Sequence, residues 1–326
     1  MAEVTSESIF ATASSGESAP DSLTMANGSL WVEWGNGASS TAFPGTDGSS
    51  TIVEYSKSGA IENTYTLGGQ VDGLKLDPAT GDVWALQNQD ANSTLSLIDP
   101  ATQQVSQMLQ WGSGYVYGAN SSRGFDDVAF DGRTVFISQT SPSPGDPVVS
   151  QVINGNSPFG TLETQSILRD GDTGTNLLTG QTNQPLPVSD PDSLKLLPDG
   201  DLILTSEADK AFTFIHDPGK VNQTESFINL PSSAGTPDDA VMVTASSGAF
   251  YLSAGSLNEV IKVEATGLSR EDLYASVGNN LDQINLKSGQ VTVLASDVSG
   301  AHGLLFVPSG SGATAPGTVP DHTNIA

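Results

Sequence analysis

Six short tripeptides led by an aspartate or a histidine recur along the chain, and each opens an apolar run of high β-strand propensity. They are separated by roughly 46 to 66 residues, within or a little above the range expected of propeller repeats. Their first residues are candidates for acid–base or metal chemistry. The six are Asp21-Ser22-Leu23, Asp72-Gly73-Leu74, Asp126-Asp127-Val128, Asp192-Ser193-Leu194, Asp238-Asp239-Ala240 and His302-Gly303-Leu304.

Carboxylates that converge from several repeats require compensation. Two unit charges a few ångströms apart repel by about 4 kcal/mol at an effective dielectric near 20. Either the acids take up protons with raised pKa values, or a cation lies among them, and oxygen ligands suit Ca²⁺ better than zinc. We therefore expect a Ca²⁺ site formed by Asp21, Asp72, Asp126, Asp192 and Asp238. The structural alternative is that each aspartate only caps a turn at the entry to a strand.

The elements that must position these residues are short β-strands. The first repeat is typical, with strands expected at 23–25, 30–34, 51–55 and 61–67, joined by Asn-Gly and Lys-Ser-Gly turns. Almost nothing in the sequence reads as an amphipathic helix. Four-stranded antiparallel units that cannot bury both faces alone stack radially, so the sequence predicts an all-β fold, a β-propeller with six blades, with five as the alternative.

The end of the ring is predicted to be irregular. Five strands are expected between the fifth and sixth tripeptides, and little strand signal follows Val307, so we expect the N-terminal strand Ser8 to Ala13 to complete the last blade. Residues 1–308 are predicted to form one domain, and residues 309–326 a flexible C-terminal tail. The Gly-, Thr- and Asn-rich segment 170–187 is predicted to be a long surface loop, within which Asp170 to Asn176 has part of the pattern of a calcium loop.

The repeated pattern of an Asp or His, a small residue, an apolar strand, a turn and a strand such as Val83-Trp84-Ala85-Leu86 resembles six-bladed propellers of the NHL and SMP-30/gluconolactonase-like group. The resemblance implies that the first tripeptide residues converge at the mouth of a central channel. It also implies a metal-dependent lactone hydrolase, although Asp21 stands where the group has Glu, and Asp126 and Asp192 stand where it has Asn. His302-Gly303-Leu304 is similar to a motif of streptogramin lyases.

Composition limits the partners and the compartment. With 37 acidic against 11 basic residues the formal charge is −26, which disfavours binding to nucleic acid or to anionic lipid. No segment is long and apolar enough for membrane insertion, and no cysteine is present. The high content of Ser, Thr, Asn and Gly favours an extracellular or periplasmic location with the signal peptide absent, and a cytoplasmic location stays open.

Two functions from different classes follow. The first is a metal-dependent hydrolase of lactones or esters, in which His302 and Asp192 are catalytic and a small molecule is the ligand. The second is a non-catalytic binding module for a protein or a glycan. Serine-hydrolase, zinc-peptidase, nucleotide-phosphate and dinucleotide signatures are missing. Further residues that follow second strands and could reach the mouth are Asn36, Asn88 and Glu207.

Overall fold

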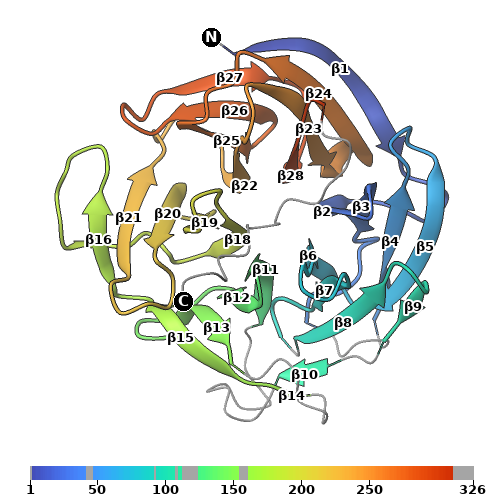
Figure 1. Cartoon of the computed structure of the whole chain (residues 1–326), viewed down its shortest axis with the longest axis horizontal. Helices are drawn as coiled ribbons and strands as arrows, with labels where there is room; N and C mark the ends of the chain where they lie inside the picture. The colour runs from blue at the N-terminus through green and yellow to red at the C-terminus, as the bar shows by residue number, and fades with distance from the viewer. Residues whose placement is uncertain are drawn as a thin grey trace, which may run out of the picture.

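The computed structural model describes residues 2–41, 47–91, 93–106, 109–111, 124–153 and 161–310. Figure 1 shows a ring of six β-sheets around a central channel, which confirms the predicted all-β propeller and the six-blade count. The innermost strands of blades 1 to 6 are β2, β6, β11, β18, β22 and β28. Residues 311–326 of the predicted tail lie outside the described part of the chain.

Blades 1 to 4 follow the chain in order, and each begins at its innermost strand. Blades 2 and 4 carry extra short strands at the outer edge. Blade 1 is β2 (Pro20–Ala26), β3 (Ser29–Trp34), β4 (Ser49–Tyr55) and β5 (Ile61–Gly68); blade 2 is β6 (Val71–Leu76), β7 (Val83–Gln87) and β8 (Thr94–Asp99) with β9 (Gln104–Val105), β10 (Leu109–Trp111) and β14 (Thr161–Leu162). Blade 3 is β11 (Phe125–Asp131), β12 (Thr134–Gln139), β13 (Pro147–Val152) and β15 (Thr164–Arg169); blade 4 is β18 (Pro191–Leu196), β19 (Leu202–Ser206), β20 (Ala211–His216) and β21 (Thr224–Asn229) with β16 (Thr173–Asn176) and β17 (Gln184–Pro185).

Blades 5 and 6 are interleaved. After β22 (Pro237–Met242), the innermost strand of blade 5, the chain crosses to blade 6 and forms β23 (Ser247–Ala254) and β24 (Glu259–Thr266). It returns to complete blade 5 with β25 (Asp272–Val277), β26 (Asn280–Asn285) and β27 (Val291–Ala295), and then supplies the innermost strand of blade 6, β28 (Ala301–Pro308). The N-terminal strand β1 (Glu3–Thr12) pairs with β24 and completes blade 6, as the sequence predicted.

The segment 170–187 is not the long loop that the sequence predicted. Its residues form β16, which runs parallel to β21, and β17, which pairs with β16, so the segment widens blade 4. The potential calcium loop within it is a turn followed by a strand. Asp172 accepts a hydrogen bond from the backbone N–H of Arg169 at 2.7 Å, a common role for an aspartate in a turn.

The core lies between neighbouring blades. Middle strands such as β3 are buried on both faces because each blade packs between two others. Trp31, Trp34 and Trp84 are buried, and Trp31 stacks on Tyr65 with ring centroids 5.3 Å apart, so these aromatic side chains belong to the core. Burying one large apolar side chain contributes about 1.5–3 kcal/mol. The one helical element of the described residues is the 3₁₀ turn η1 (Gly255–Leu257), and no helix among them could cross a bilayer.

Candidate functional site

A β-bulge at every tripeptide aims its side chains into the channel. In blade 1 the pairing of β2 with β3 steps from Pro20–Trp34 directly to Leu23–Val32, so Asp21 and Ser22 together face one residue of the partner strand. An extra residue of this kind bends a strand and re-aims its side chains. The same shift occurs in the innermost strand of the other five blades. The first and second tripeptide residues can therefore both line the channel.

The five predicted aspartates line one cavity on the propeller axis, with Ser22, Ser193 and Gly303 among their neighbours. We refer to the first tripeptide residues as the acidic ring. His302 joins this ring through a hydrogen bond of 2.6 Å between its Nδ1 and Oδ2 of Asp238. With its amide nitrogen turned toward the ring, Gln89 donates to Asp72 at 2.6 Å. The members of the acidic ring are Asp21, Asp72, Asp126, Asp192, Asp238 and His302.

Burial is the main cause of the perturbed pKa values in the ring. It raises the pKa of Asp72, Asp126 and Asp192 well above the usual range, and neighbouring negative charges raise these values further. Burial raises the pKa of Asp238 to about 7. The hydrogen bond from His302 to Asp238 raises the pKa of the imidazole to about 10. The ring therefore favours protons, or another source of positive charge, over a set of bare carboxylates.

Two overlapping groups in the ring bring ligand atoms within 4.8 Å of one another. One group is Asp192, Glu207 and Asp238, and the other is Asp21, Asp238 and His302. Glu207, placed below the tripeptide residues in the sequence analysis, thus belongs to the site. Asp126 is in neither group, but it is 2% exposed, and neither of its carboxylate oxygens makes a hydrogen bond of ordinary geometry among the described residues, although the Thr140 hydroxyl is near enough to lower its pKa.

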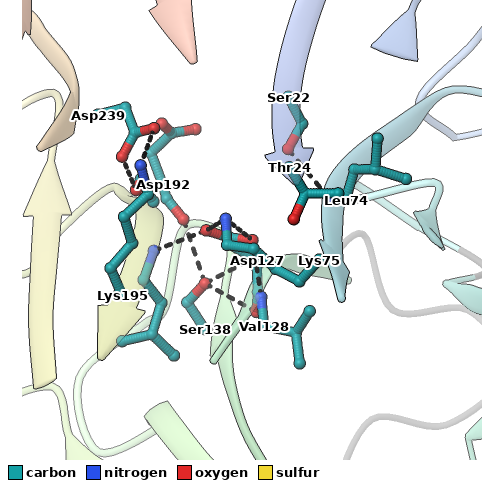
Figure 2. Close-up of polar contacts among 12 residues, drawn as sticks. Ser22, Thr24, Leu74, Lys75, Asp127, Val128, Ser138, Asp192, Lys195 and Asp239 are labelled. Carbon is teal, nitrogen blue, oxygen red and sulfur yellow. Dashed lines mark hydrogen bonds and ion pairs between the residues drawn. The ribbon is translucent and has the colours of Figure 1, made fainter. Parts of the chain in front are cut away.

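A second set of charged side chains lies next to the acidic ring, and we refer to it as the channel floor (Figure 2). Its members are Lys75, Asp127, Lys195 and Asp239. Lys75 Nζ contacts both carboxylate oxygens of Asp127, at 2.8 and 3.0 Å, and Lys195 pairs with Asp239. Each of these aspartates also accepts a backbone N–H from the next blade, Asp127 from Leu194 at 3.0 Å and Asp239 from Leu304 at 2.7 Å.

The role of the residue at the second tripeptide position differs between odd- and even-numbered blades. The second tripeptide residue of blades 1, 3 and 5 is Ser22, Asp127 or Asp239, and each side chain accepts the N–H of the innermost strand of the next blade. In blades 2 and 6 the same position is glycine. A Cβ at Gly73 would lie 2.7 Å from the carbonyl oxygen of Asp126, and one at Gly303 would lie 2.4 Å from that of Asp21. Only glycine allows this close approach of two backbones.

Sequence analysis missed three charged residues of the channel region: Lys75, Lys195 and Glu33. Glu33 lies on β3 opposite the Asp21 bulge and is fully buried. Neither of its carboxylate oxygens makes a hydrogen bond of ordinary geometry among the described residues, although the Ser50 hydroxyl is near enough to lower its pKa. Burial raises its pKa well above the usual value. The equivalent positions of blades 3 and 5 carry Ser138 and Ser276, so an alignment of the blades would have singled out Glu33.

Asn36 and Asn88 have structural roles instead of lining the mouth. The Asn36 side chain accepts the backbone N–H of Ser18 at 2.9 Å and donates to Thr51 Oγ1 at 2.9 Å. Asn88 is fully buried, and its amide oxygen would lie 2.2 Å from a Cβ at Gly69, so it packs tightly against that turn.

A second histidine, at the end of β20 in blade 4, forms a chain of hydrogen bonds. His216 contacts Asp201 Oδ2 through Nδ1 at 2.5 Å and Ser226 Oγ through Nε2 at 2.8 Å, the bond pattern of a Ser-His-Asp triad. Ser226 is buried in the middle of β21, which pairs with β20 on one side and β16 on the other. Pairing with both neighbouring strands uses the backbone N–H groups that an oxyanion hole would need. We therefore interpret these hydrogen bonds as a structural link between strands.

Comparisons with known proteins support the architecture. No protein-family model and no curated protein sequence matches the chain. Among solved structures, a candidate gluconolactonase aligns with a TM-score of 0.51 at 13% identity over 92% of this chain and 83% of its own. A protein of unknown function from Bacteroides caccae aligns with a TM-score of 0.51 at 10% identity, over 88% and 86% of the two chains.

A third similar structure is virginiamycin B lyase from Staphylococcus aureus, with a TM-score of 0.49 at 14% identity over 90% of this chain and 73% of its own. At identities this low the comparisons support only the β-propeller fold. The chemistry of the site must therefore be argued from its own residues.

Proposed function

We propose that the acidic ring binds a divalent cation, Ca²⁺ as the first candidate, and hydrolyses the ester bond of a lactone or another small ester. The observation that carries the proposal is the pair of overlapping groups around Asp238. One offers three carboxylates, and the other joins Asp238 to a histidine. A metal site beside a proton donor is the arrangement that metal-assisted hydrolysis uses.

The residues present fit such a cation. Asp192, Glu207 and Asp238 would hold it, because carboxylate oxygens are the ligands that hard divalent cations prefer. The buried and unpartnered carboxylate of Asp126 adds negative charge at the same cavity. When bound, the cation would polarise the ester carbonyl. The sequence analysis named Asp192 both as a catalytic residue and as a cation ligand, and here we propose only the second role for it.

His302 and Asp21 would move the protons. His302 carries a proton at neutral pH because its hydrogen bond to Asp238 raises its pKa to about 10, so it can donate to the leaving alkoxide as the C–O bond breaks. Asp21 lies in the same group and would accept a proton from the water that adds to the carbonyl carbon. Return of that proton to His302 restores both groups and leaves a carboxylic acid and an alcohol.

The size and charge of the mouth limit the substrate. The cavity within the ring is about 20 Å³, which is room for a cation or a water molecule but not for a whole substrate, so only the ester group of a substrate could reach into it. The strongly negative ring would repel an anionic substrate. We therefore propose a small neutral lactone or ester. The shared ring fold of the candidate gluconolactonase supports a lactone as the first substrate class to examine.

The experiment compares hydrolysis of neutral δ- and γ-lactones and of phenyl acetate by the wild type, Asp192→Asn and His302→Ala, each with added Ca²⁺. Each substitution should lower kcat by about 100-fold or more, the usual contribution of a positioned proton donor or charge. Glu7→Gln, at an exposed position of β1, is the matched control and should retain full turnover. Turnover retained in both variants would refute the proposal, and a wild type that binds Ca²⁺ but hydrolyses none of these compounds would favour the binding-module alternative.

A further inference from the structure

The interleaving of blades 5 and 6 places a glycine directly against His302. Gly255 begins η1, the turn that joins β23 to β24, and His302 lies on β28, the strand that pairs with β23. A Cβ at Gly255 would lie 2.9 Å from Cδ2 and 3.2 Å from Nε2 of the imidazole. The backbone of Gly255 has no positive φ, so the imidazole, and not the backbone conformation, is what excludes a side chain here.

The turn that carries Gly255 is held from several sides. The Gly255 N–H donates to the carbonyl of Gly300 at 2.8 Å. Asn258 accepts the backbone N–H of Ala19 on its side-chain oxygen at 2.7 Å and that of Ala13 on its carbonyl at 3.0 Å. These bonds tie the turn to the loop before β28 and to the segment between β1 and β2.

The imidazole is the part of this contact that can move. Its Nδ1 is held by Asp238, its side chain is 43% exposed, and rotation about its side-chain bonds would carry it off that carboxylate toward solvent. Since the turn is fixed and the ring is not, a methyl group at position 255 would displace the ring. The bare backbone at Gly255 therefore leaves the space that the imidazole needs in the orientation in which it contacts Asp238.

We propose that Gly255 is a positioning residue for His302, which keeps the imidazole hydrogen-bonded to Asp238 and aligned with the substrate of the mouth. The claim that this orientation matters for hydrolysis rests on the proposed function. The claim that Gly255 positions the imidazole rests on the contact between Gly255 and His302 alone, so stability and NMR measurements can test it without turnover.

A double-mutant cycle in thermal unfolding tests the contact. Gly255→Ala should lower Tm by a few degrees in the wild-type background, since displacing the imidazole removes its hydrogen bond to the Asp238 carboxylate, and a hydrogen bond to a charged group contributes about 1.5–3 kcal/mol. In the His302→Ala background the same substitution should cost nothing, because the methyl group fits the space that the imidazole leaves. Gly35→Ala is the matched control, since its Cβ would be 3.4 Å from the nearest atom, an ordinary contact, and it should show no coupling to His302.

Proton NMR gives a readout that a merely structural role would not move. We expect a downfield imidazole N–H resonance in the wild type, assigned by its absence in His302→Ala, and its loss in Gly255→Ala with retention in Gly35→Ala. For hydrolysis, Gly255→Ala should lower kcat by about 100-fold with KM little changed, as expected when a proton donor is displaced by about 1 Å.

Additive stabilities together with a retained resonance would overturn the inference. A coupled cycle and a lost resonance in a protein that hydrolyses no ester would support the positional role and reject the proposed function. If Gly255→Ala alone fails to fold, folding of the Gly255→Ala/His302→Ala double variant supports the inference, and failure of both overturns it.

Discussion

The acidic ring and the channel floor place neighbouring aspartates in opposite situations. Asp126 and Asp127 are consecutive on one strand, and both are buried. Asp127 contacts Lys75 and accepts the N–H of Leu194, whereas Asp126 has no ion pair among the described residues, and the nearby Thr140 hydroxyl only partly offsets its burial. A buried carboxylate without a partner is costly, so the two layers differ in whether the fold itself stabilises their charge.

The same contrast recurs in blade 5. Burial alone would raise the pKa of Asp239, but Lys195 and Lys75 bring it below the usual value. Burial raises the pKa of its neighbour Asp238 to about 7, although His302 contacts it, and the nearby acids Asp21 and Glu207 raise this pKa further. The charge of Asp239 is thus compensated within the folded chain and that of Asp127 partly so, since burial still raises the pKa of Asp127 although Lys75 lowers it. The ring, in contrast, requires protons or a cation. Function is to be sought in the layer whose charges the fold leaves uncompensated.

The largest effect is expected from breaking the floor. Asp239→Asn removes the partner of Lys195, whose side chain is 14% exposed, and leaves a buried ammonium group unpaired. Loss of one partner of a buried ion pair costs about 3–5 kcal/mol. Chemical denaturation should show this loss. Glu271→Gln, which breaks the exposed pair with Lys287, is the control and should cost less than about 1 kcal/mol. Equal losses in the two variants would contradict the distinction between a buried floor and the surface.

A pH dependence opposite to ordinary acid denaturation should follow from the ring. The folded pKa of Asp238 is raised from 3.8 to about 7, so its contribution to stability is complete below pH 4 and is lost as the pH rises through 7. The raised pKa of His302 acts in the same direction up to about pH 10. Between pH 5 and 7, Asp238 alone should remove about 2 kcal/mol.

Thermal unfolding in chelator at pH 5 and pH 8 measures this dependence. The melting temperature should be higher at pH 5, and the difference should shrink in Asp238→Asn. A melting temperature that instead falls between pH 8 and pH 5 would mean that the ring carboxylates are compensated by the fold.

Removing an uncompensated charge should stabilise the protein. Asp126→Asn replaces a buried carboxylate that lacks partners with a neutral side chain of the same shape. We expect a gain of about 1–3 kcal/mol without a cation, the cost of an unsatisfied buried group. Its neighbour gives the matched comparison, because Asp127→Asn should destabilise. The same sign of change in both variants, measured by denaturant unfolding in chelator, would abolish the contrast.

A smaller gain is expected at Glu33. Glu33→Ser places in blade 1 the residue that blades 3 and 5 have at the equivalent position, where Ser138 and Ser276 donate to backbone carbonyls at the bulge. Relief of the buried carboxyl should outweigh the space left behind by about 1 kcal/mol. Glu54→Ser, which removes a buried glutamate that is hydrogen-bonded to Asn63, should destabilise, and a loss of stability in both variants would contradict the gain expected at Glu33.

The ring architecture could be predicted because each blade repeats one pattern of tripeptide, turns and apolar strands. The interleaving of β23 and β24 could not, since strand patterns show that a strand exists but not which sheet it joins. The acidic ring was accessible for the same reason as the fold, whereas the floor was not. Lys75 and Asp127 are 52 residues apart in sequence, and the packing of blade 2 against blade 3 brings them to 2.8 Å.

Calcium binding by the chelator-treated protein, followed by calorimetric titration and by thermal unfolding, tests the central claim most directly. The account predicts saturable binding to the wild type and a gain of about 3 kcal/mol at 100 times the dissociation constant. It predicts loss of both in Asp192→Asn and retention of both in Glu7→Gln. A wild type that binds no cation, or an Asp192→Asn variant that binds as well as the wild type, would contradict it.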